Sequence, residues 1–186
     1  TTSMILHVLK SLDQSDYSID LNFDYLVGAQ LEGFERMVKL SDAPIMVIEG
    51  DEYLSSPIDR RPKFLHYKPH ISIITGIAWD HINVFPTFEE YVEQFDLFLN
   101  SFDDKGKVYY YKNDEILVNL VEQNGAINAE PYESFNYKIN DGETILLIEN
   151  GDTIPLKIFG KHNLENLRAA YNVCMDLGIR STDFFK

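Results

Sequence analysis

The stretch that decides the fold is ISIITGIAWDH, residues 71–81, in which a β-branched apolar run leads directly into the pair Asp80-His81. A second stretch, IMVIEGDEY at residues 45–53, has the same layout, with Glu49 and further acidic residues after the apolar run. Uninterrupted apolar runs of this kind are typical of strands that are buried on both faces of a parallel sheet. Ligands of such sheets bind beyond the carboxyl ends of the strands, so both stretches predict chemistry at that edge.

Glu49 and His81 are residue types that hold divalent metal ions. A hard dication prefers carboxylate oxygens and tolerates an imidazole. If the two strands are neighbours in one parallel sheet, their ends bring Glu49 and His81 to one cleft. A hydrogen-bonded histidine at a strand end is the competing interpretation of His81, and Asp80 fits the role of orienting its neighbourhood rather than binding metal.

A third feature is the stretch GKHNLEN, residues 160–166, which opens a predicted helix near the C-terminus. Asn163 and Asn166 are about one turn apart and therefore share a helix face. An asparagine amide offers one donor and one acceptor, which matches the N6/N7 edge of adenine. Helix capping by Asn163 is the alternative, and His162 at the same helix start can pack on the base. Together the three features indicate a nucleotide-using enzyme core.

The remaining sequence alternates helices and strands before it changes character. We expect helices over residues 2–12, 87–102, 114–122 and 163–178, and strands over residues 23–27, 45–48, 71–75 and 107–111. From residue 132 to 159 the pattern predicts an antiparallel meander of about three strands, with a hairpin turn at Asn150-Gly151-Asp152. The fold class is therefore α/β, with a mostly parallel sheet flanked by helices and a small antiparallel meander.

Composition narrows the possible functions. The chain has 186 residues and a net charge of −14, which argues against general nucleic-acid binding because that requires a basic surface. No apolar run approaches the roughly 18 residues of a membrane span, and the N-terminal sequence does not resemble a signal peptide. Cys174 is the single cysteine, so we expect a reducing, cytoplasmic environment and a structural thiol rather than a nucleophile.

A local basic segment interrupts the acidic sequence. It contains Arg60, Arg61, Lys63 and Lys68, with His66 and His70 alongside. One interpretation is a solvated loop, and the other is an anchor for an anionic substrate. A bound divalent metal would further reduce the repulsion between this acidic chain and a phosphate group.

Three motifs resemble those of the central, ATP-binding domain of the Mur ligase family and occur in the same order. The resemblance covers nearly the whole chain. Glu49-Gly50-Asp51-Glu52-Tyr53 is similar to the acidic metal-binding strand end of the family, and Asp80-His81 to its Asp-His motif. Gly160-Lys161-His162-Asn163 with Asn166 is similar to its Gly-x-His-Asn-x-x-Asn motif. The resemblance implies Mg²⁺ at Glu49 and His81, which would be the catalytic residues, and ATP with its adenine against His162, Asn163 and Asn166.

The resemblance also implies a domain organisation. Residues 1–186 would be a central-domain fragment that starts just after a glycine-rich phosphate loop, with an antiparallel subdomain at residues 132–159. Residues 180–186 would lead into a C-terminal domain. The N-terminal and C-terminal domains of the same enzyme would then be partners of this chain, and the fragment alone would be inactive.

Within the family, Tyr53 and the run from Asp59 to Tyr67 resemble the murein peptide ligase branch. That branch joins the recycled peptide L-alanyl-γ-D-glutamyl-meso-diaminopimelate to UDP-N-acetylmuramate through an acyl phosphate. The resemblance places five residues on the substrate side, namely Asp51, Glu52, Tyr53, Arg60 and Arg61. Because arginine binds carboxylates bidentately, Arg60 or Arg61 is expected to recognise the peptide or the UDP-sugar.

Other functions are compatible with the same sequence. UDP-N-acetylmuramate–L-alanine ligases are the alternative within the family, and folylpolyglutamate synthases share its fold and ATP chemistry. A non-catalytic nucleotide-binding or interaction module is the alternative of another class, in which the acidic loops are only solvated. One departure from the family pattern is Gly76-Ile77-Ala78, where the family often has Asn-Ile-Glu, so a contact of that Asn or Glu is lost or replaced.

Overall fold

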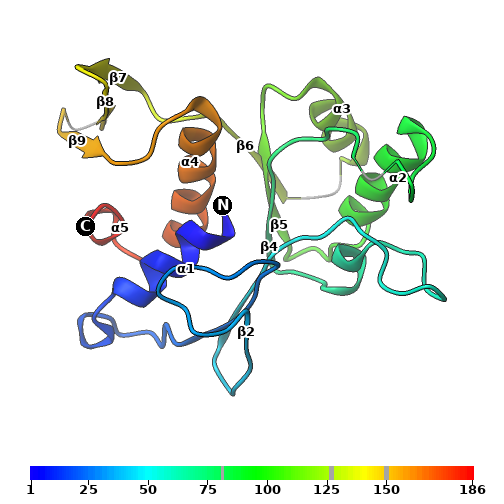
Figure 1. Cartoon of the computed structure of the whole chain (residues 1–186), viewed down its shortest axis with the longest axis horizontal. Coiled ribbons are helices and arrows are strands. Elements are labelled where there is room, and N and C mark those ends of the chain that lie inside the picture. The colour runs from blue at the N-terminus through cyan, green and yellow to red at the C-terminus, as the bar shows by residue number, and fades with distance from the viewer. Residues whose placement is uncertain (81, 126–127, 149–150) are drawn as a thin grey trace. The chain divides into compact units, whose positions relative to one another are not determined.

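The computed structural model describes residues 1–80, 82–125, 128–148 and 151–186 (Figure 1). The chain forms two compact units, of which the first comprises Thr1–Glu49 and Ser134–Lys186, and the second comprises Gly50–Glu133. Parallel strands, flanking helices and a separate antiparallel sheet confirm the predicted α/β class with its small meander. None of the helices in the described ranges is both long and apolar enough to cross a membrane.

The first unit begins with helix α1 and a small mixed sheet. In this sheet Phe23 lies opposite Ile45 and Leu26 opposite Ile48, so β1 and β3 run parallel, and β2 joins β1 antiparallel. The buried face of α1 places Leu6 in a cluster with aromatic and aliphatic side chains of the sheet and its loops. The bounds are α1 Thr2–Ser11, 3-10 helix η1 Gln14–Asp16, β1 Phe23–Leu26, β2 Val38–Lys39 and β3 Ile45–Ile48.

The first unit is completed by the meander and two helices. β8 pairs antiparallel with both β7 and β9, which confirms the predicted hairpins, although residues 149 and 150 of the predicted turn lie outside the described residues. Phe135, Leu146 and Leu164 form the buried cluster between meander and helix, and α4 also packs on α1. The bounds are β7 Tyr137–Asn140, β8 Glu143–Leu147, β9 Thr153–Leu156, α4 Lys161–Asp176 and α5 Ser181–Phe184.

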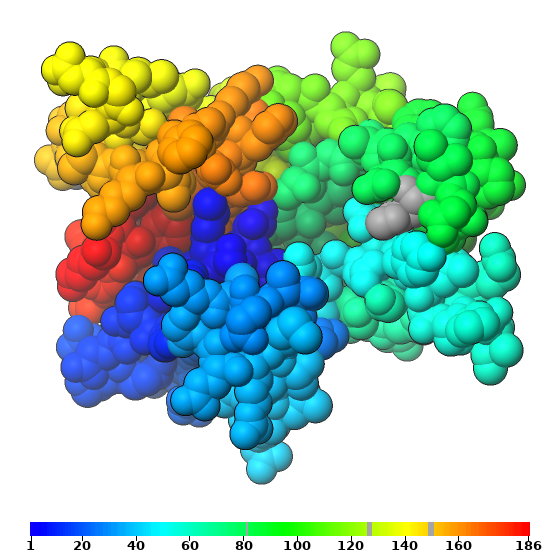
Figure 2. All heavy atoms as spheres, in the orientation of Figure 1, coloured from blue at the N-terminus to red at the C-terminus, as the bar shows by residue number. Residues whose placement is uncertain are grey.

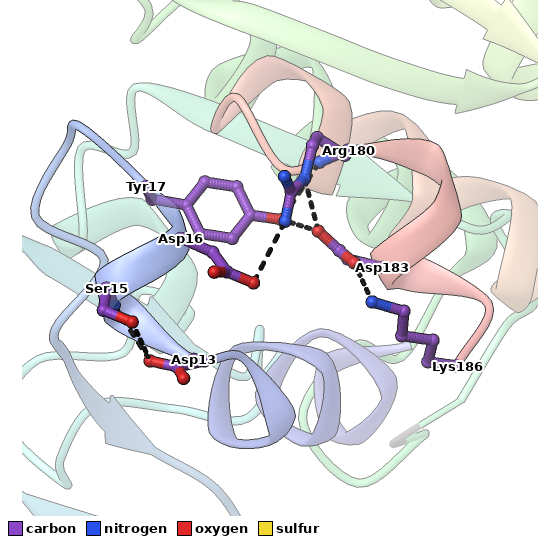
Figure 3. A network of polar contacts seen from close by, with 7 residues as sticks. All are labelled: Asp13, Ser15, Asp16, Tyr17, Arg180, Asp183 and Lys186. Carbon is purple, nitrogen blue, oxygen red and sulfur yellow. Dashed lines mark hydrogen bonds and ion pairs between the residues drawn. The ribbon is translucent and has the colours of Figure 1, made fainter.

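A polar network closes the first unit at its C-terminal end (Figure 3). The carboxylate of Asp183, which is buried, accepts hydrogen bonds from the hydroxyl of Tyr17, Nε of Arg180 and Nζ of Lys186, each at 2.6 Å. Arg180 also pairs with Asp16 at 3.3 Å. These bonds join α5 to the segment after α1, two parts of the chain that are far apart in sequence.

The second unit is built on a parallel sheet of order β4-β5-β6. Ile71 lies opposite Lys107, and Lys107 opposite Asn128, so the three strands are in register at their starts. Helix α2 buries Tyr91, Phe95, Phe98 and Leu99, and a capping box of Thr87 and Glu90 starts it. The bounds are 3-10 helix η2 Lys63–His66, β4 Ile71–Ile74, α2 Phe88–Leu99, β5 Lys107–Tyr111, α3 Glu115–Asn124 and β6 Asn128–Tyr132.

The structure adds two strands to those that the sequence predicted. Within their own units, β3 pairs with β1 and β4 pairs with β5. β2 and β6 were not expected: β2 has two exposed residues, and β6 has the sequence NAEPY, which lacks an apolar run. Pro131 is tolerated there because β6 is at the edge of its sheet.

Candidate functional site

Glu49 lies where the two parallel strands of the first unit end. Its main-chain amide donates to the carbonyl of Leu26 at 2.9 Å, which extends the β1–β3 pairing by one residue. Its carboxylate oxygen Oε2 accepts a hydrogen bond from the amide of Gly28 at 2.7 Å, and the side chain remains exposed. The exposed carboxylate at the carboxyl edge of parallel strands is in the position that the sequence predicted.

Asn166 and Glu49 both lie close to Thr1, the residue that precedes α1. The Thr1 hydroxyl donates to Oδ1 of Asn166 at 2.7 Å. Helix α1, which follows Thr1, packs against both α4 and β3, and Glu49 directly follows β3. The structure therefore brings Asn166 from α4 and Glu49 from the end of β3 to the start of α1.

His162 and Asn163 lie at the start of α4, after a glycine that the backbone requires. Gly160 has φ of 89°, in the left-handed region that favours glycine. The Asn163 amide donates to the carbonyl of Phe159 at 2.8 Å, so it stabilises the approach to the helix, and its side chain is exposed. His162 is exposed, with Nδ1 at 3.1 Å from Oε2 of the buried Glu165.

The residues of the first unit fit a magnesium ion in part. Mg²⁺ in proteins usually takes one or two carboxylates and completes its shell with water and substrate phosphates, which Glu49 can satisfy. Over the described ranges, no three His, Cys, Asp or Glu side chains converge into a metal-binding group. His81, the other predicted ligand, lies outside the described residues, so its pairing with Glu49 stays a prediction.

The acidic stretch that follows Glu49 is held by contacts within the second unit. Asp51 pairs with Lys63 at 2.6 Å and accepts from the amide of Tyr53 at 2.7 Å. The Tyr53 hydroxyl accepts from Nδ2 of Asn83 at 3.0 Å. The predicted substrate-side residues Asp51 and Tyr53 are thus oriented by partners.

Glu52 is hydrogen-bonded to Tyr91, a buried residue of α2. Burial, together with the carboxylates of Glu52 and Asp80, raises the pKa of the Tyr91 hydroxyl well above its usual range. Tyr91 therefore stays protonated and can act as a donor to Glu52. The sequence showed Tyr91 only as part of an apolar stripe, so this polar role was missed.

The loop before Asp80 explains the departure from the family pattern at residue 76. Gly76 has φ of 147°, and a Cβ there would lie 3.1 Å from Oδ2 of Asp114. The same carboxylate accepts from the amide of Ile77 at 2.6 Å and, through Oδ1, from the amide of Leu117 at 3.0 Å. Asp114 therefore caps α3 and holds the loop, and glycine is the residue that fits.

Gly28 was also missed by the sequence analysis. Its amide orients Glu49, and a glycine directly after the predicted strand at residues 23–27 was the signal that could have revealed it. The two predicted arginines differ in their environment. Both are exposed, but Arg61 forms a two-pronged ion pair with Asp59, whereas Arg60 has no carboxylate partner among the described residues.

Comparison with known proteins identifies relatives of the whole chain. The family described as Mur ligase middle domain matches residues 1–174. The UDP-N-acetylmuramate–L-alanyl-γ-D-glutamyl-meso-2,6-diaminoheptandioate ligase of Haemophilus influenzae is 25% identical over all of this chain and 41% of its own length. The UDP-N-acetylmuramate–L-alanine ligase of Francisella philomiragia is 26% identical over all of this chain and 41% of its own length. The chain thus spans less than half the length of these curated relatives.

Solved structures share the fold. The ligase for UDP-N-acetylmuramate and L-alanyl-γ-D-glutamyl-meso-diaminopimelate from Neisseria meningitidis superposes with a TM-score of 0.80 at 22% identity, over 99% of this chain and 60% of that one. The MurF ligase of Thermotoga maritima, solved in complex with ADP, gives a TM-score of 0.68 at 16% identity, over 100% of this chain and 45% of that one. At these identities the likeness concerns the fold.

Proposed function

Because the chain belongs to the Mur ligase family as its middle domain, we propose that it is the ATP-binding core of a larger ligase that acts on UDP-N-acetylmuramate. The relatives from Haemophilus and Francisella are both named for that substrate. The observation that carries the proposal is that the first unit contains both predicted sides of the site: Asn166 is bonded to Thr1 at the start of α1, and Glu49 follows β3, which packs on α1. N-terminal and C-terminal domains would complete the enzyme, since the chain covers 41% of each relative.

The proposed roles of the residues follow from their positions. Glu49 would hold Mg²⁺ near the phosphates of ATP, and His81 would hold a second Mg²⁺ near the acceptor carboxylate. The adenine would lie against His162, Asn163 and Asn166. When bound, the metal supplies positive charge that offsets the negative charge on the transferred phosphoryl group. Gly28 fixes one oxygen of Glu49 and leaves the other available.

The proposed reaction is the formation of an amide from a carboxylate and an amine. The carboxylate of UDP-N-acetylmuramate takes the γ-phosphoryl group of ATP and becomes an acyl phosphate, and ADP is released. The amine nitrogen then attacks the acyl carbon, the phosphate leaves with the C–O electron pair, and the amine loses a proton. The tasks of the protein are to position the groups and to neutralise charge. A related structure that contains ADP supports this use of ATP.

We propose the peptide L-alanyl-γ-D-glutamyl-meso-diaminopimelate as the amine substrate, which would place the enzyme in peptidoglycan recycling. The support is the name of the Haemophilus relative and the resemblance of Tyr53 and residues 59–67 to that branch. L-Alanine is the second candidate, because the Francisella relative is similar at 26% identity and is named for it. The peptide has several carboxylates where L-alanine has one, so a basic loop favours the peptide.

Phosphate release by the complete enzyme tests the proposal. The enzyme is given ATP, Mg²⁺ and UDP-N-acetylmuramate with either the tripeptide or L-alanine, and kcat/KM is measured for each amine. We expect turnover that requires all three substrates and a higher kcat/KM for the tripeptide. A higher value for L-alanine would identify an alanine ligase, and no turnover with either amine would contradict a ligase of this type.

A further inference from the structure

Residues 53–63 of the second unit form a hairpin that main-chain hydrogen bonds hold closed. The amide of Ser55 donates to the carbonyl of Arg61 at 2.9 Å, and the amide of Lys63 donates to the carbonyl of Tyr53 at 3.1 Å. The Ser55 hydroxyl adds a second bond to the Arg61 carbonyl at 2.8 Å. Because both ends of the ladder are paired, the tip has a defined position relative to its stem.

The hairpin is also anchored in the hydrophobic core. The side chain of Pro62 is fully buried, and Phe64, which follows the hairpin, is buried as well. The ring of Phe64 packs against Phe95 and Phe98 of α2, with centroids 5.5 and 5.0 Å apart. The hairpin is therefore anchored to the core of this unit through Pro62 and Phe64, while its tip is exposed to solvent.

Carboxylates within the same segment engage two of its cations. Asp59 receives Nε and Nη2 of Arg61 at 2.9 and 2.7 Å, and Nε2 of His66 lies 3.3 Å from the same carboxylate. The hydrogen bonds of Arg61 lower the pKa of Asp59 far below its usual range, so Asp59 stays ionised. Lys63 is paired with Asp51. Arg61 and Lys63 therefore brace the hairpin.

Arg60 differs from both of these cations. Within residues 53–63, all of which the structure describes, it is the cation that has no carboxylate partner, and its side chain is exposed. Its neighbour Ile58 at the turn is 98% exposed. Figure 2 shows the cyan segment that contains this turn protruding at the edge of the second unit. On a chain with a net charge of −14, this unpaired guanidinium on a backbone that hydrogen bonds hold in place can bind an anion.

We propose that Arg60 binds an oxyanion of one of the two organic substrates, and that Arg61 is a positioning residue that holds the hairpin. The oxyanion is a carboxylate of the peptide or an acidic group of the UDP-sugar. This inference rests on the proposed function. The sequence predicted substrate recognition for Arg60 or Arg61 without distinguishing them, and the structure supports Arg60. A guanidinium fork suits either group, whereas an arginine already paired with Asp59 has its fork occupied.

The test compares the complete enzyme with its Arg60→Ala, Arg60→Lys and Arg61→Ala variants in the phosphate-release assay. Each of UDP-N-acetylmuramate, the tripeptide and ATP is varied in turn. For Arg60→Ala we expect about a tenfold rise in the KM of one organic substrate, as for a lost charge-assisted hydrogen bond, with kcat and the KM of ATP little changed. Arg60→Lys should recover part of the loss because it keeps the charge but not the fork.

The substrate whose KM rises identifies the source of the oxyanion. A rise confined to ATP, or no change in any KM, would overturn the assignment of Arg60. Calorimetric binding of UDP-N-acetylmuramate and of the tripeptide to the wild-type enzyme distinguishes a failure of the proposed function from a failure of the role of Arg60. If neither binds, the proposed function fails and the inference with it; if they bind and Arg60→Ala is unaffected, the inference alone fails.

The role of Arg61 is tested by a second measurement, which does not depend on enzyme activity. Loss of the ion pair to Asp59 should loosen the hairpin and speed the cleavage by trypsin after Arg60, read by mass spectrometry at short digestion times. Arg36→Ala, which removes an exposed arginine of the first unit, is the matched control. Arg61→Ala could instead leave this cleavage rate unchanged and raise the KM of an organic substrate about tenfold. Arg61 would then be the residue that binds the oxyanion, and the assignment to Arg60 would be wrong.

Discussion

The hydroxyl of Thr1 donates a hydrogen bond to Oδ1 of Asn166 at 2.7 Å, which joins the start of α1 to the side of α4. One acceptor of the predicted adenine-binding residue is therefore in use within the protein, while its amide NH₂ remains for a ligand. Asn163, one turn earlier, donates to Phe159 and has its own carbonyl oxygen exposed. Both asparagines thus combine a contact that orders the first unit with a polar group that a nucleotide can meet.

Substitution of these asparagines should weaken the binding of ATP. We expect Asn163→Ala and Asn166→Ala in the complete enzyme each to raise the KM for ATP, because each removes a contact that is remote from the reacting phosphate. One good hydrogen bond contributes about 1 kcal/mol, which corresponds to roughly a fivefold rise in KM. Asn172→Ala is the control on the same helix, since Asn172 bonds to Arg168 instead. An unchanged KM for ATP in both test variants would reject the adenine assignment.

Glu49 should be essential for turnover but not for folding. Glu49→Ala removes the carboxylate proposed to hold Mg²⁺, so we expect phosphate release to fall below detection at any Mg²⁺ concentration. Its structural cost is one hydrogen bond to the exposed Gly28 amide, about 1 kcal/mol or less. Circular dichroism during heating checks the fold, and the exposed Glu35→Ala serves as the control. Appreciable activity in Glu49→Ala would remove Glu49 from the metal site.

Asp183 should stabilise the first unit in a pH-dependent way. Hydrogen bonds from Lys186, Tyr17 and Arg180 hold the pKa of its carboxyl far below the usual range. A carboxyl whose pKa is lowered by folding contributes stability above its unfolded pKa of about 3.9, and that contribution is lost as the pH falls toward the folded value. Asp183→Asn should therefore have a lower Tm than the wild type near neutral pH.

The difference in Tm between wild type and Asp183→Asn should shrink as the pH drops below about 4, because the Asp183 carboxyl then takes up a proton in the unfolded chain while the folded chain keeps it ionised. Asp42→Asn, an exposed change in the same unit, should shift Tm little at either pH. Thermal scans across this range supply the measurement. A Tm difference that does not change with pH would mean that the ion pairs of Figure 3 contribute little to stability.

Cys174 should be unreactive while the chain is folded. It is fully buried in α4, and burial raises the pKa of its thiol to about 12. Because the thiolate is the reactive form, we expect slow alkylation by iodoacetamide near pH 8 and rapid alkylation after unfolding in urea. Mass spectrometry follows the reaction without ambiguity because Cys174 is the single cysteine. Rapid labelling of the folded chain would show that the α4 core opens.

Signals that act over a few residues allowed much of the fold to be predicted. The strands at residues 45–48 and 71–74 are recognisable from their own apolar side chains, although both are mostly half-buried in the structure and Met46 is exposed. The antiparallel pairing of β8 with β9 follows from two apolar runs around a glycine-containing turn. Each of these features depends on the chemistry of neighbours in sequence, so the sequence by itself determined it.

The site depended on contacts that only the folded chain creates. Gly28 reaches Glu49, and Thr1 reaches Asn166, because parallel strands and packed helices bring together residues that are distant in sequence. Local patterns carry no information about such distances. The sequence also offered no reason to distinguish Arg60 from Arg61. The closed hairpin distinguishes them, because its geometry pairs Arg61 with Asp59 and leaves Arg60 without a carboxylate partner in the described residues.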